Sequence, residues 1–271
     1  MKNKTFKILI FAVSMAIAIG TVNTNIYAKE INNKQELRTE ISKNLNKHKT
    51  KFSFTTTKMK IGIKKMQALL IAELKYNPNN NYEIGLLKHY RISYYTTTYG
   101  SYFKTKYNIE FKYRETKKQQ KHVNKKVKSI IKKLKLNKKS DYQKAKLITK
   151  WISNNVKYDL AYKNYTAYKA LTQKKAVCQG FALLSSKLYN AAGLKSYIIT
   201  GKSISGTNHV WNAVKIKDKF YYADNCYYEN VKGSGKEDKY SLFGTNAAKK
   251  DRYQDLKIKG VKISKNNYKK K

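Results

Sequence analysis

The chain has 271 residues and a formal net charge of +43, from 59 Lys and Arg against 16 Asp and Glu. Hydrophobic residues make up 41% of the chain and aromatic residues 13%, including 24 Tyr. This apolar content excludes a disordered basic tail and predicts a sizeable buried core, while the charge predicts attraction to polyanions in general.

The N-terminus has the order of a secretory signal peptide. Lysines at positions 2, 4 and 7 precede an apolar stretch from Ile8 to Ile19, and a polar segment then ends in the small Ala28. Because the stretch is short for a permanent membrane span, we expect a signal peptide over residues 1–28 and a secreted or cell-surface protein, exported as in Gram-positive bacteria. An uncleaved anchor is the alternative, since Ile26 stands where cleavage favours a small residue.

Residues 29–115 are predicted to form a smaller N-terminal region of mixed α+β structure. The segment "NKQELRTEISKNLNK" spaces its apolar residues four apart, as in a helix, and "KKMQALLIAELK" also has a helical pattern. The segment "KFSFTTT" alternates as a strand does. In "YFKTKYNIEFKY" the apolar and polar residues alternate throughout, which predicts a half-buried strand.

From residue 116 the pattern becomes helical, and we place the start of a second domain there, over 116–230. The first segment, "TKKQQKHVNKKVKSIIKKLKL", is a basic amphipathic helix that can bind a membrane or an anionic polymer, although a solvated face over a buried stripe is the favoured interpretation. Ser140 and Gln143 have the spacing of a capping box at the start of the next helix. Residues 231–271 are predicted to be a basic C-terminal tail.

Cys178 is one of only two cysteines, and we predict that it begins an α-helix. In "CQGFALLSSKLYNAAG" the apolar residues recur at three- and four-residue steps, and Gly193 follows as a C-terminal stop. The dipole and unpaired N–H groups of a helix start favour the thiolate, which would lower the thiol pKa from about 8.5. The backbone N–H groups of Cys178 and Gln179 can also hold an oxyanion.

Four histidines are candidates for the base that a thiolate nucleophile needs, and the pattern favours His209. His48 and His122 lie in Lys-rich helical stretches and are expected to be solvated, whereas His89 lies either on a strand surface or towards the core. His209 belongs to "NHVWNAVKIKDKFYYADNC", a hairpin pattern of two strands around a turn at Lys217 and Asp218.

A two-residue turn would fix the register of this hairpin. His209 and Asp224 then become diagonal neighbours, close enough for the carboxylate to orient the imidazole in a Cys-His-Asp triad. The alternatives are a turn residue at the strand end for Asp224 and a satisfied surface histidine for His209, and a one-residue slip would separate the two. The expected pairs are Ile216 with Lys219, Trp211 with Asp224, and His209 with Cys226.

At these residues the sequence resembles the transglutaminase-like superfamily, in its secreted bacterial type. The resemblance implies a papain-like α+β core in which a Cys-bearing helix packs on an antiparallel sheet. It also implies Cys178 as nucleophile, His209 as general base and acid, and Asp224 as its orienting partner. The similar segments are "VKYD" from Val156, "YTAYKALTQKKAVCQGFA" from Tyr165, "NHVWNAVKI" from Asn208 and "KFYYAD" from Lys219.

Cys226 marks a departure from that family. Many relatives continue after the Asp with Thr-Trp, where this chain has Cys226 and Tyr227. On a strand opposite His209, Cys226 can form a disulfide with Cys178 or act as a redox switch, as an exported protein permits. It is a weaker nucleophile than Cys178 because it lacks a helix start. An inert, buried Cys226 is the favoured interpretation.

These observations predict an exported thiol enzyme that acts on amide bonds of a protein or peptide by acyl transfer, as a peptidase or amidase or as a cross-linking enzyme. No metal or organic cofactor is expected, and Trp211 and Tyr168 are either cleft walls or ordinary core residues. The charge predicts adherence to an anionic cell-wall polymer or a membrane surface, and nucleic acid is not expected as a partner. The alternative function is a non-catalytic basic protein that binds a polyanion.

Overall fold

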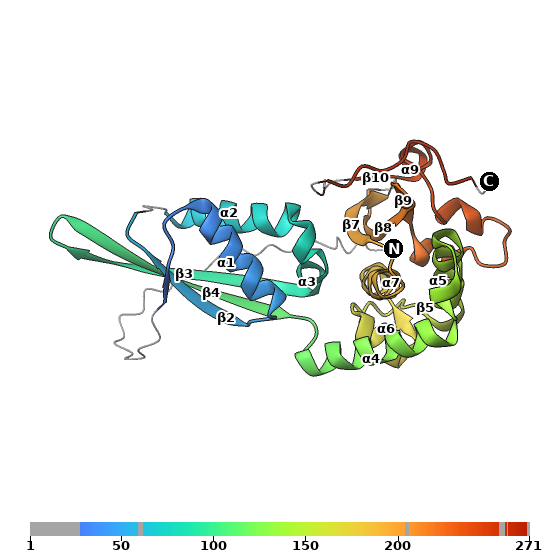
Figure 1. Cartoon of the computed structure of the whole chain (residues 1–271), viewed down its shortest axis with the longest axis horizontal. Coiled ribbons are helices and arrows are strands. Elements are labelled where there is room, and N and C mark those ends of the chain that lie inside the picture. The colour runs from blue at the N-terminus through green and yellow to red at the C-terminus, as the bar shows by residue number, and fades with distance from the viewer. Residues whose placement is uncertain (1–27, 59–61, 204–205, 255–257, 259, 270–271) are drawn as a thin grey trace. The chain divides into compact units, whose positions relative to one another are not determined.

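A computed structural model describes residues 28–58, 62–203, 206–254, 258 and 260–269. Apart from Ala28, the predicted signal peptide lies outside these residues. The chain divides into two compact units, Met1–Tyr113 and Arg114–Lys271 (Figure 1), two residues before the predicted boundary. Among the described helices, none is long and apolar enough to cross a membrane.

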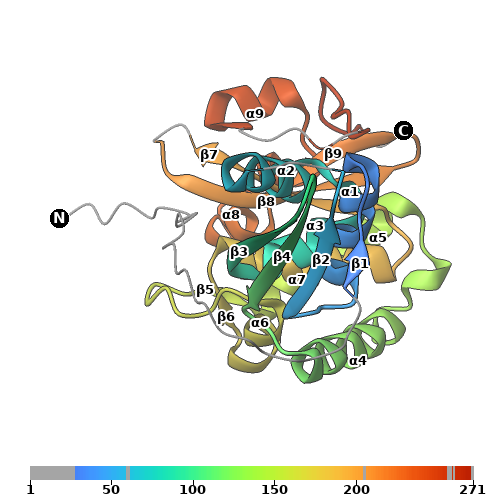
Figure 2. The same ribbon diagram turned by 90° about the vertical axis from the view of Figure 1, so that its left-hand side faces the viewer.

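The first unit is a four-stranded sheet in the order β1-β2-β4-β3 (Figure 2), with helices on one face. The β1 and β2 strands are parallel and the other pairs are antiparallel. The strand predicted over residues 102–113 is confirmed as β4. The elements are β1 Lys29–Glu30, α1 Lys34–Asn46, β2 Lys51–Thr56, α2 Ile63–Tyr76, the 3-10 helix η1 Pro78–Asn80, α3 Asn81–Leu86, β3 Leu87–Tyr99 and β4 Tyr102–Tyr113.

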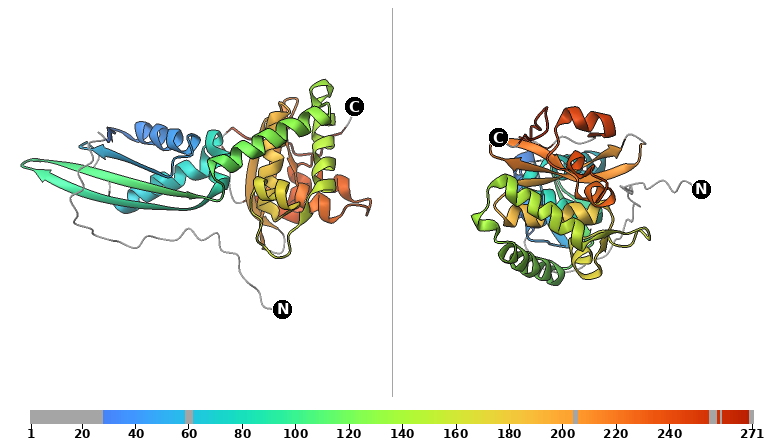
Figure 3. Two further views of the ribbon diagram at one scale, coloured as in Figure 1. Left: turned by 90° about the horizontal axis from the view of Figure 1, so that it is seen from below. Right: turned by 90° about the vertical axis from the view of Figure 1, so that its right-hand side faces the viewer.

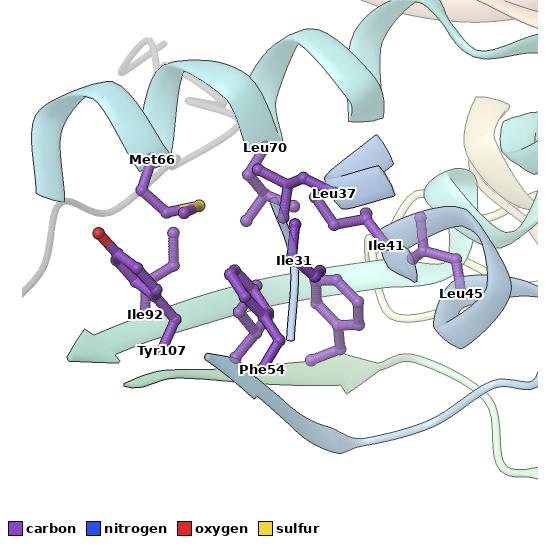
Figure 4. Packing of buried hydrophobic residues seen from close by; sticks show 11 residues of the cluster. Ile31, Leu37, Ile41, Leu45, Phe54, Met66, Leu70, Ile92 and Tyr107 are labelled. Carbon is purple, nitrogen blue, oxygen red and sulfur yellow. The ribbon is translucent and has the colours of Figure 1, made fainter. Parts of the chain in front are cut away.

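The core of the first unit lies between the two long helices and the sheet (Figure 4). The four-residue spacing predicted for α1 places Leu37, Ile41 and Leu45 on its buried side. From the sheet, Phe54 stacks on Tyr107 with ring centroids 5.2 Å apart. The alternation of β4 turns its apolar side chains to this core, so the sequence pattern and the packing agree.

His48 was expected to be solvated, and the structure corrects this. It follows α1 with a positive φ of 50° and is 7% exposed. Its ring stacks on Tyr113 at 3.6 Å, and its Nδ1 lies 3.3 Å from a carboxylate oxygen of Glu83. Partners far along the chain therefore bury this histidine. His89 and His122 are both exposed.

The β3–β4 hairpin forms an arm that extends beyond the other strands of its sheet (Figure 1). Pairing within the hairpin continues to Tyr99 and Tyr102, whereas β2 accompanies β4 only from Thr105 to Glu110. Since β3 is at the end of the sheet, one side of it faces no other strand of that sheet. The arm also carries exposed tyrosines, of which Tyr95 is 54% exposed.

The second unit begins with two consecutive helices, α4 and α5, as predicted (Figure 3). The predicted capping box of Ser140 and Gln143 is present at the start of α5. The elements are α4 Lys117–Lys133, η2 Leu136–Lys138, α5 Asp141–Asn155, β5 Lys157–Tyr158, α6 Ala167–Gln173, β6 Lys175–Ala176, α7 Cys178–Ala191, β7 Ser196–Ser203, β8 Asn208–Ile216, β9 Lys219–Ala223, α8 Asn225–Asn230, η3 Glu237–Tyr240, α9 Thr245–Asp251 and β10 Arg252–Gln254.

Helix α7 packs on an antiparallel sheet of order β10-β7-β8-β9 (Figure 1). On the helix side of the sheet, Asn212 Nδ2 donates a 3.0 Å hydrogen bond to the carbonyl oxygen of Ala182. On the other side, Trp211 is 1% exposed within an apolar cluster, so it is a core residue. The predicted fold class, α+β with a Cys-bearing helix on an antiparallel sheet, is confirmed.

The described residues between 231 and 269 do not form a separate tail, which corrects that prediction. The backbone N–H of Phe243 donates to the Tyr222 carbonyl at 2.9 Å, and β10 pairs with β7. Phe243 and Ile258 are buried in the same cluster as Trp211. These few apolar residues complete the far side of the sheet, although the segment around them is polar and basic.

Gly180 allows the first turn of α7 to approach the chain beside it. A Cβ at this position would lie 2.8 Å from the Cβ of Ala176, 3.1 Å from the carbonyl oxygen of Asn164 and 3.2 Å from the backbone nitrogen of Thr166. Two of these three neighbours are backbone atoms, which cannot rotate away. The helix start and the loop before α6 therefore fit together only without a side chain here.

Replacing Gly180 with Ala is expected to lower the free energy of unfolding by about 1–3 kcal/mol, because the added methyl group overpacks this contact. Urea denaturation followed by circular dichroism measures the change. On an open helix surface the same substitution would stabilise the protein by up to about 1 kcal/mol. An increase in stability would therefore contradict the close approach.

Candidate active site

Cys178 is the first residue of α7 and is partly exposed. The preceding residue, Val177, is the N-cap and offers no capping side chain. The N–H groups in the first turn of a helix have no acceptor within the helix, and they carry its positive dipole end. The sulfur therefore lies at a helix start that favours negative charge, as the sequence pattern predicted.

The structure brings the three predicted triad residues together. His209 lies in β8, and its Nε2 is 2.6 Å from Oδ2 of Asp224. The imidazole also hydrogen-bonds with the Cys178 side chain. Since Nε2 is occupied by Asp224, the ring presents Nδ1 to the sulfur. Hydrogen bonds thus connect Cys178 to His209 and His209 to Asp224.

The strand register differs from the prediction beyond the turn. Ile216 pairs with Lys219 as expected, but β9 ends at Ala223, opposite Asn212. Asp224 is therefore not paired with Trp211; it is the N-cap of α8. Its Oδ1 accepts the backbone N–H of Tyr227 at 2.9 Å, so this carboxylate both starts a helix and holds the imidazole.

Cys226 consequently lies in α8 and not on a strand opposite His209, which corrects the second part of the register. It is 3% exposed. No disulfide joins Cys178 and Cys226 in the part of the chain that the structure describes. Tyr158 interacts electrostatically with both: burial raises the pKa of its phenol, and the charges of Cys178 and Cys226 raise it further.

The electrostatic environment keeps His209 protonated. Burial by itself would lower the pKa of this imidazole, but the charge and hydrogen bond of Asp224, together with its contact to Cys178, raise the pKa to about 9. Aromatic rings surround it: the Trp211 ring lies at 5.8 Å and the Tyr227 ring at 4.5 Å. Tyr168, a candidate cleft wall in the sequence, instead contacts His122 at 5.4 Å.

Asn225 is a positioning residue that the sequence analysis missed. Its Nδ2 donates to Ser185 Oγ at 2.7 Å and to the Tyr189 hydroxyl at 3.1 Å, both on α7. Because Asn225 follows Asp224 directly, these bonds fix the start of α8 against the helix that bears the nucleophile. Only its position next to Asp224 could have drawn attention to it.

Asp159 is a second missed residue, although it ends the "VKYD" segment. Its carboxylate accepts the backbone N–H groups of Ala161, Lys163 and Asn164 at 2.8–3.1 Å, and also the Asn164 side-chain amide. Burial would raise the pKa of this carboxyl, but the four hydrogen bonds hold it below its usual range. An ionised Asp159 thus fixes the loop over residues 159–166.

The part of the chain that the structure describes contains no group of three or more His, Cys, Asp and Glu side chains that could hold a metal ion. The site therefore offers a thiol, an imidazole, a carboxylate and the backbone donors of a helix start. These groups suit covalent catalysis at a carbonyl carbon.

Part of the chain is similar to known proteins. Residues 128–225 match the family model of the transglutaminase-like superfamily. Human kyphoscoliosis peptidase is 28% identical over 105 residues, which cover 32% of this chain and 16% of that protein. The crystal structure of a TGase matches 74% of this chain and 59% of its own with 16% identity and a TM-score of 0.37. The chain thus spans less than two thirds of both proteins, and its similarity to the superfamily rests on the sequence match over residues 128–225.

The proton affinity of His209 links the stability of the fold to pH. Its pKa of about 9 lies above the unfolded value of about 6.5. Its contribution is therefore fully present below pH 6.5 and is lost as the pH rises through about 9. A Cys178→Ala background removes the contribution of the neighbouring thiol, so that Asp224 alone raises the His209 pKa, to a value below about 9. There, we expect the free energy of unfolding to fall by up to about 1.4 kcal/mol per pH unit as the pH rises from 6.5 towards this lower value.

The control is Asp224→Asn in the same background. Asparagine still caps α8 but removes the negative charge, so the slope should flatten. Urea unfolding at stepped pH measures both proteins, and equal slopes would contradict the role of the Asp224 charge.

Proposed function

Because residues 128–225 form a domain of the transglutaminase-like superfamily, we propose that this protein is a thiol enzyme that acts on amide bonds of peptides or proteins by acyl transfer. The observation that carries the proposal is the hydrogen-bonded series from the partly exposed Cys178 through the buried His209 to the buried Asp224. This arrangement supports Cys178 as the nucleophile, His209 as the general base and acid, and Asp224 as its orienting partner.

In the proposed reaction the Cys178 sulfur, as thiolate, forms a bond to the carbonyl carbon of the amide. The backbone N–H groups of Cys178 and Gln179 stabilise the oxyanion at the helix start. The C–N bond then breaks while His209, which is protonated at neutral pH, gives its Nδ1 proton to the leaving amine. A thioester remains on Cys178.

The second half of the reaction returns the thiol. Water or a primary amine attacks the thioester, His209 takes a proton from it, and an acid or a new amide leaves. Water would make the protein a peptidase or amidase, and a lysine amine would make it a cross-linking enzyme. The human relative is named a peptidase, which supports water as one acceptor. Asp224 keeps the imidazole oriented through both halves.

We expect iodoacetamide to alkylate Cys178 at pH 7 at least about tenfold faster than Cys226, because an activated nucleophile is accessible and Cys226 is buried. Peptide mass spectrometry reads the two sites separately.

Asp224→Asn should slow turnover of a glutamine-containing peptide at least about 100-fold. Cys178→Ala should abolish turnover, whereas the control Cys226→Ala should retain it.

A tagged alkyl amine supplied with the same peptide distinguishes the two acceptors, because transfer attaches the tag and hydrolysis does not. A Cys178 that reacts no faster than the thiol of glutathione, or a Cys178→Ala variant that keeps full turnover, would contradict the proposed enzyme. The latter result would favour the non-catalytic binding protein.

A second proposal concerns where the protein works. We propose that it is exported and retained by an anionic cell-wall polymer that binds the segment from Thr116 to Ser140, here called the lysine strip. The strip contains no acidic residue, and its lysines are all exposed. None of them forms an ion pair with any residue that the structure describes. They are Lys117, Lys118, Lys121, Lys125, Lys126, Lys128, Lys132, Lys133, Lys135, Lys138 and Lys139.

The packing of α4 favours a polymer over a membrane as the partner. Its apolar side chains, Val123, Val127, Ile130 and Ile131, are buried in the second unit. A helix that lies in a membrane surface needs such a face free for the lipid. The strip therefore offers charge alone, which suits a flexible chain of negative groups.

Neutralising part of the lysine strip should weaken binding to inorganic polyphosphate at least about tenfold. The slope of the logarithm of the binding constant against the logarithm of the salt concentration should also become shallower by about 3. The variant carries Lys→Gln at positions 121, 125, 128 and 132. The control carries Lys→Gln at positions 47, 49, 104 and 112, which are also exposed. Fluorescence titration over a range of salt concentrations measures both. Equal losses would show that bulk charge, and not the strip, binds the polymer.

A further inference from the structure

The loop over residues 159–166 presents two large apolar side chains to solvent. Leu160 is 80% exposed and Tyr162 is 54% exposed, and we call this pair the apolar ledge. The other large apolar side chains with such exposure among the described residues are four tyrosines of the β3–β4 arm in the first unit. Among the described residues of the second unit, large apolar side chains with this exposure thus occur in one loop.

The ledge is held rigidly. The Asp159 carboxylate accepts four hydrogen bonds from the loop, and the backbone N–H of Tyr162 donates to the Asp159 carbonyl at 3.1 Å. Tyr162 has a φ of 54°, in the left-handed region that is uncommon for a residue with a large side chain. A loop that is fixed in this way loses little further conformational entropy when it binds a ligand.

The loop that bears the ledge is bonded to the segment that leads into Cys178. Both ends of the loop bond to the strand that leads into Cys178: Asp159 N–H donates to the Ala176 carbonyl, and Val177 N–H donates to the Asn164 carbonyl, each at 2.9 Å. Tyr158 pairs with Ala176 in the parallel β5–β6 ladder. Tyr162 also packs edge-on against Tyr158 at 6.2 Å, so the ledge is fixed to the strand that pairs with the segment before Cys178.

We infer that the apolar ledge is a substrate subsite that accepts an apolar side chain of the polypeptide next to the attacked amide. This inference rests on the proposed acyl-transfer function and adds its specificity. The solvent-exposed part of these two side chains does not stabilise the fold. Covering it with a ligand removes apolar surface from water, which is favourable. Contact with the ledge would therefore favour substrates with Leu or a similar residue beside the reacting carbonyl.

The test uses two tripeptide chloromethyl ketones that differ only in Leu or Ser beside the reactive group, with iodoacetamide as a small reagent. Cys178 labelling rates are measured by mass spectrometry on the full-length protein. The ledge variant combines Leu160→Ser with Tyr162→Asn, because asparagine tolerates the left-handed backbone. The control is Tyr95→Ser, which removes a ring of equal exposure from the first unit.

The wild-type protein and the control should prefer the Leu probe about fivefold to tenfold, as expected for partial burial of one apolar side chain. The ledge variant should lose this preference and keep its iodoacetamide rate. A wild-type protein without the preference, or a variant that retains it, would overturn the ledge and leave the enzyme in place. Failure of all three reagents to label Cys178 in the wild type would overturn the enzyme and the ledge together.

Discussion

The Asp224 carboxylate is completely buried, and an ionised carboxylate in that position costs several kcal/mol unless its oxygens have partners. Oδ1 accepts the Tyr227 N–H and Oδ2 meets the His209 ring. These partners belong to α8 and β8, so both elements must meet at one point. The same requirement turns Nδ1 of His209 towards the sulfur. A charge in the core thereby fixes the geometry of the site around it.

Helix α7 is held from two sides, which keeps the sulfur at its start in place. On one side, the sheet is bonded to the helix through Asn212, and α8 through Asn225. On the other side, the loop organised by Asp159 presses against Gly180. Sites supported by packed elements in this way hold their reacting groups more precisely than sites on free loops. The exposure of Cys178 thus does not imply a mobile nucleophile.

Local chemistry explains which features could be predicted from the sequence. The helix at Cys178, the capping box at Ser140 and the turn after Ile216 depend on neighbouring residues, and all are present. The end of β9 was missed because the tyrosines after Asp224 favour strands, and this preference was given more weight than the local cap of Asp224 on Tyr227. His48 was misplaced for a different reason, since its partners lie far along the chain.

The β3–β4 arm suggests why such a high net charge is useful beyond attraction. The side of β3 that faces no other strand of its sheet has backbone groups that another strand could pair with. Natural proteins prevent such pairing with lysines at the edge and with charge repulsion between copies. On this chain the repulsion comes from the whole molecule. Contact with a polyanion would screen it and allow the arms of neighbouring copies to pair. Screening of the net charge, by salt or by a polyanion, would therefore weaken the protection of the β3 edge.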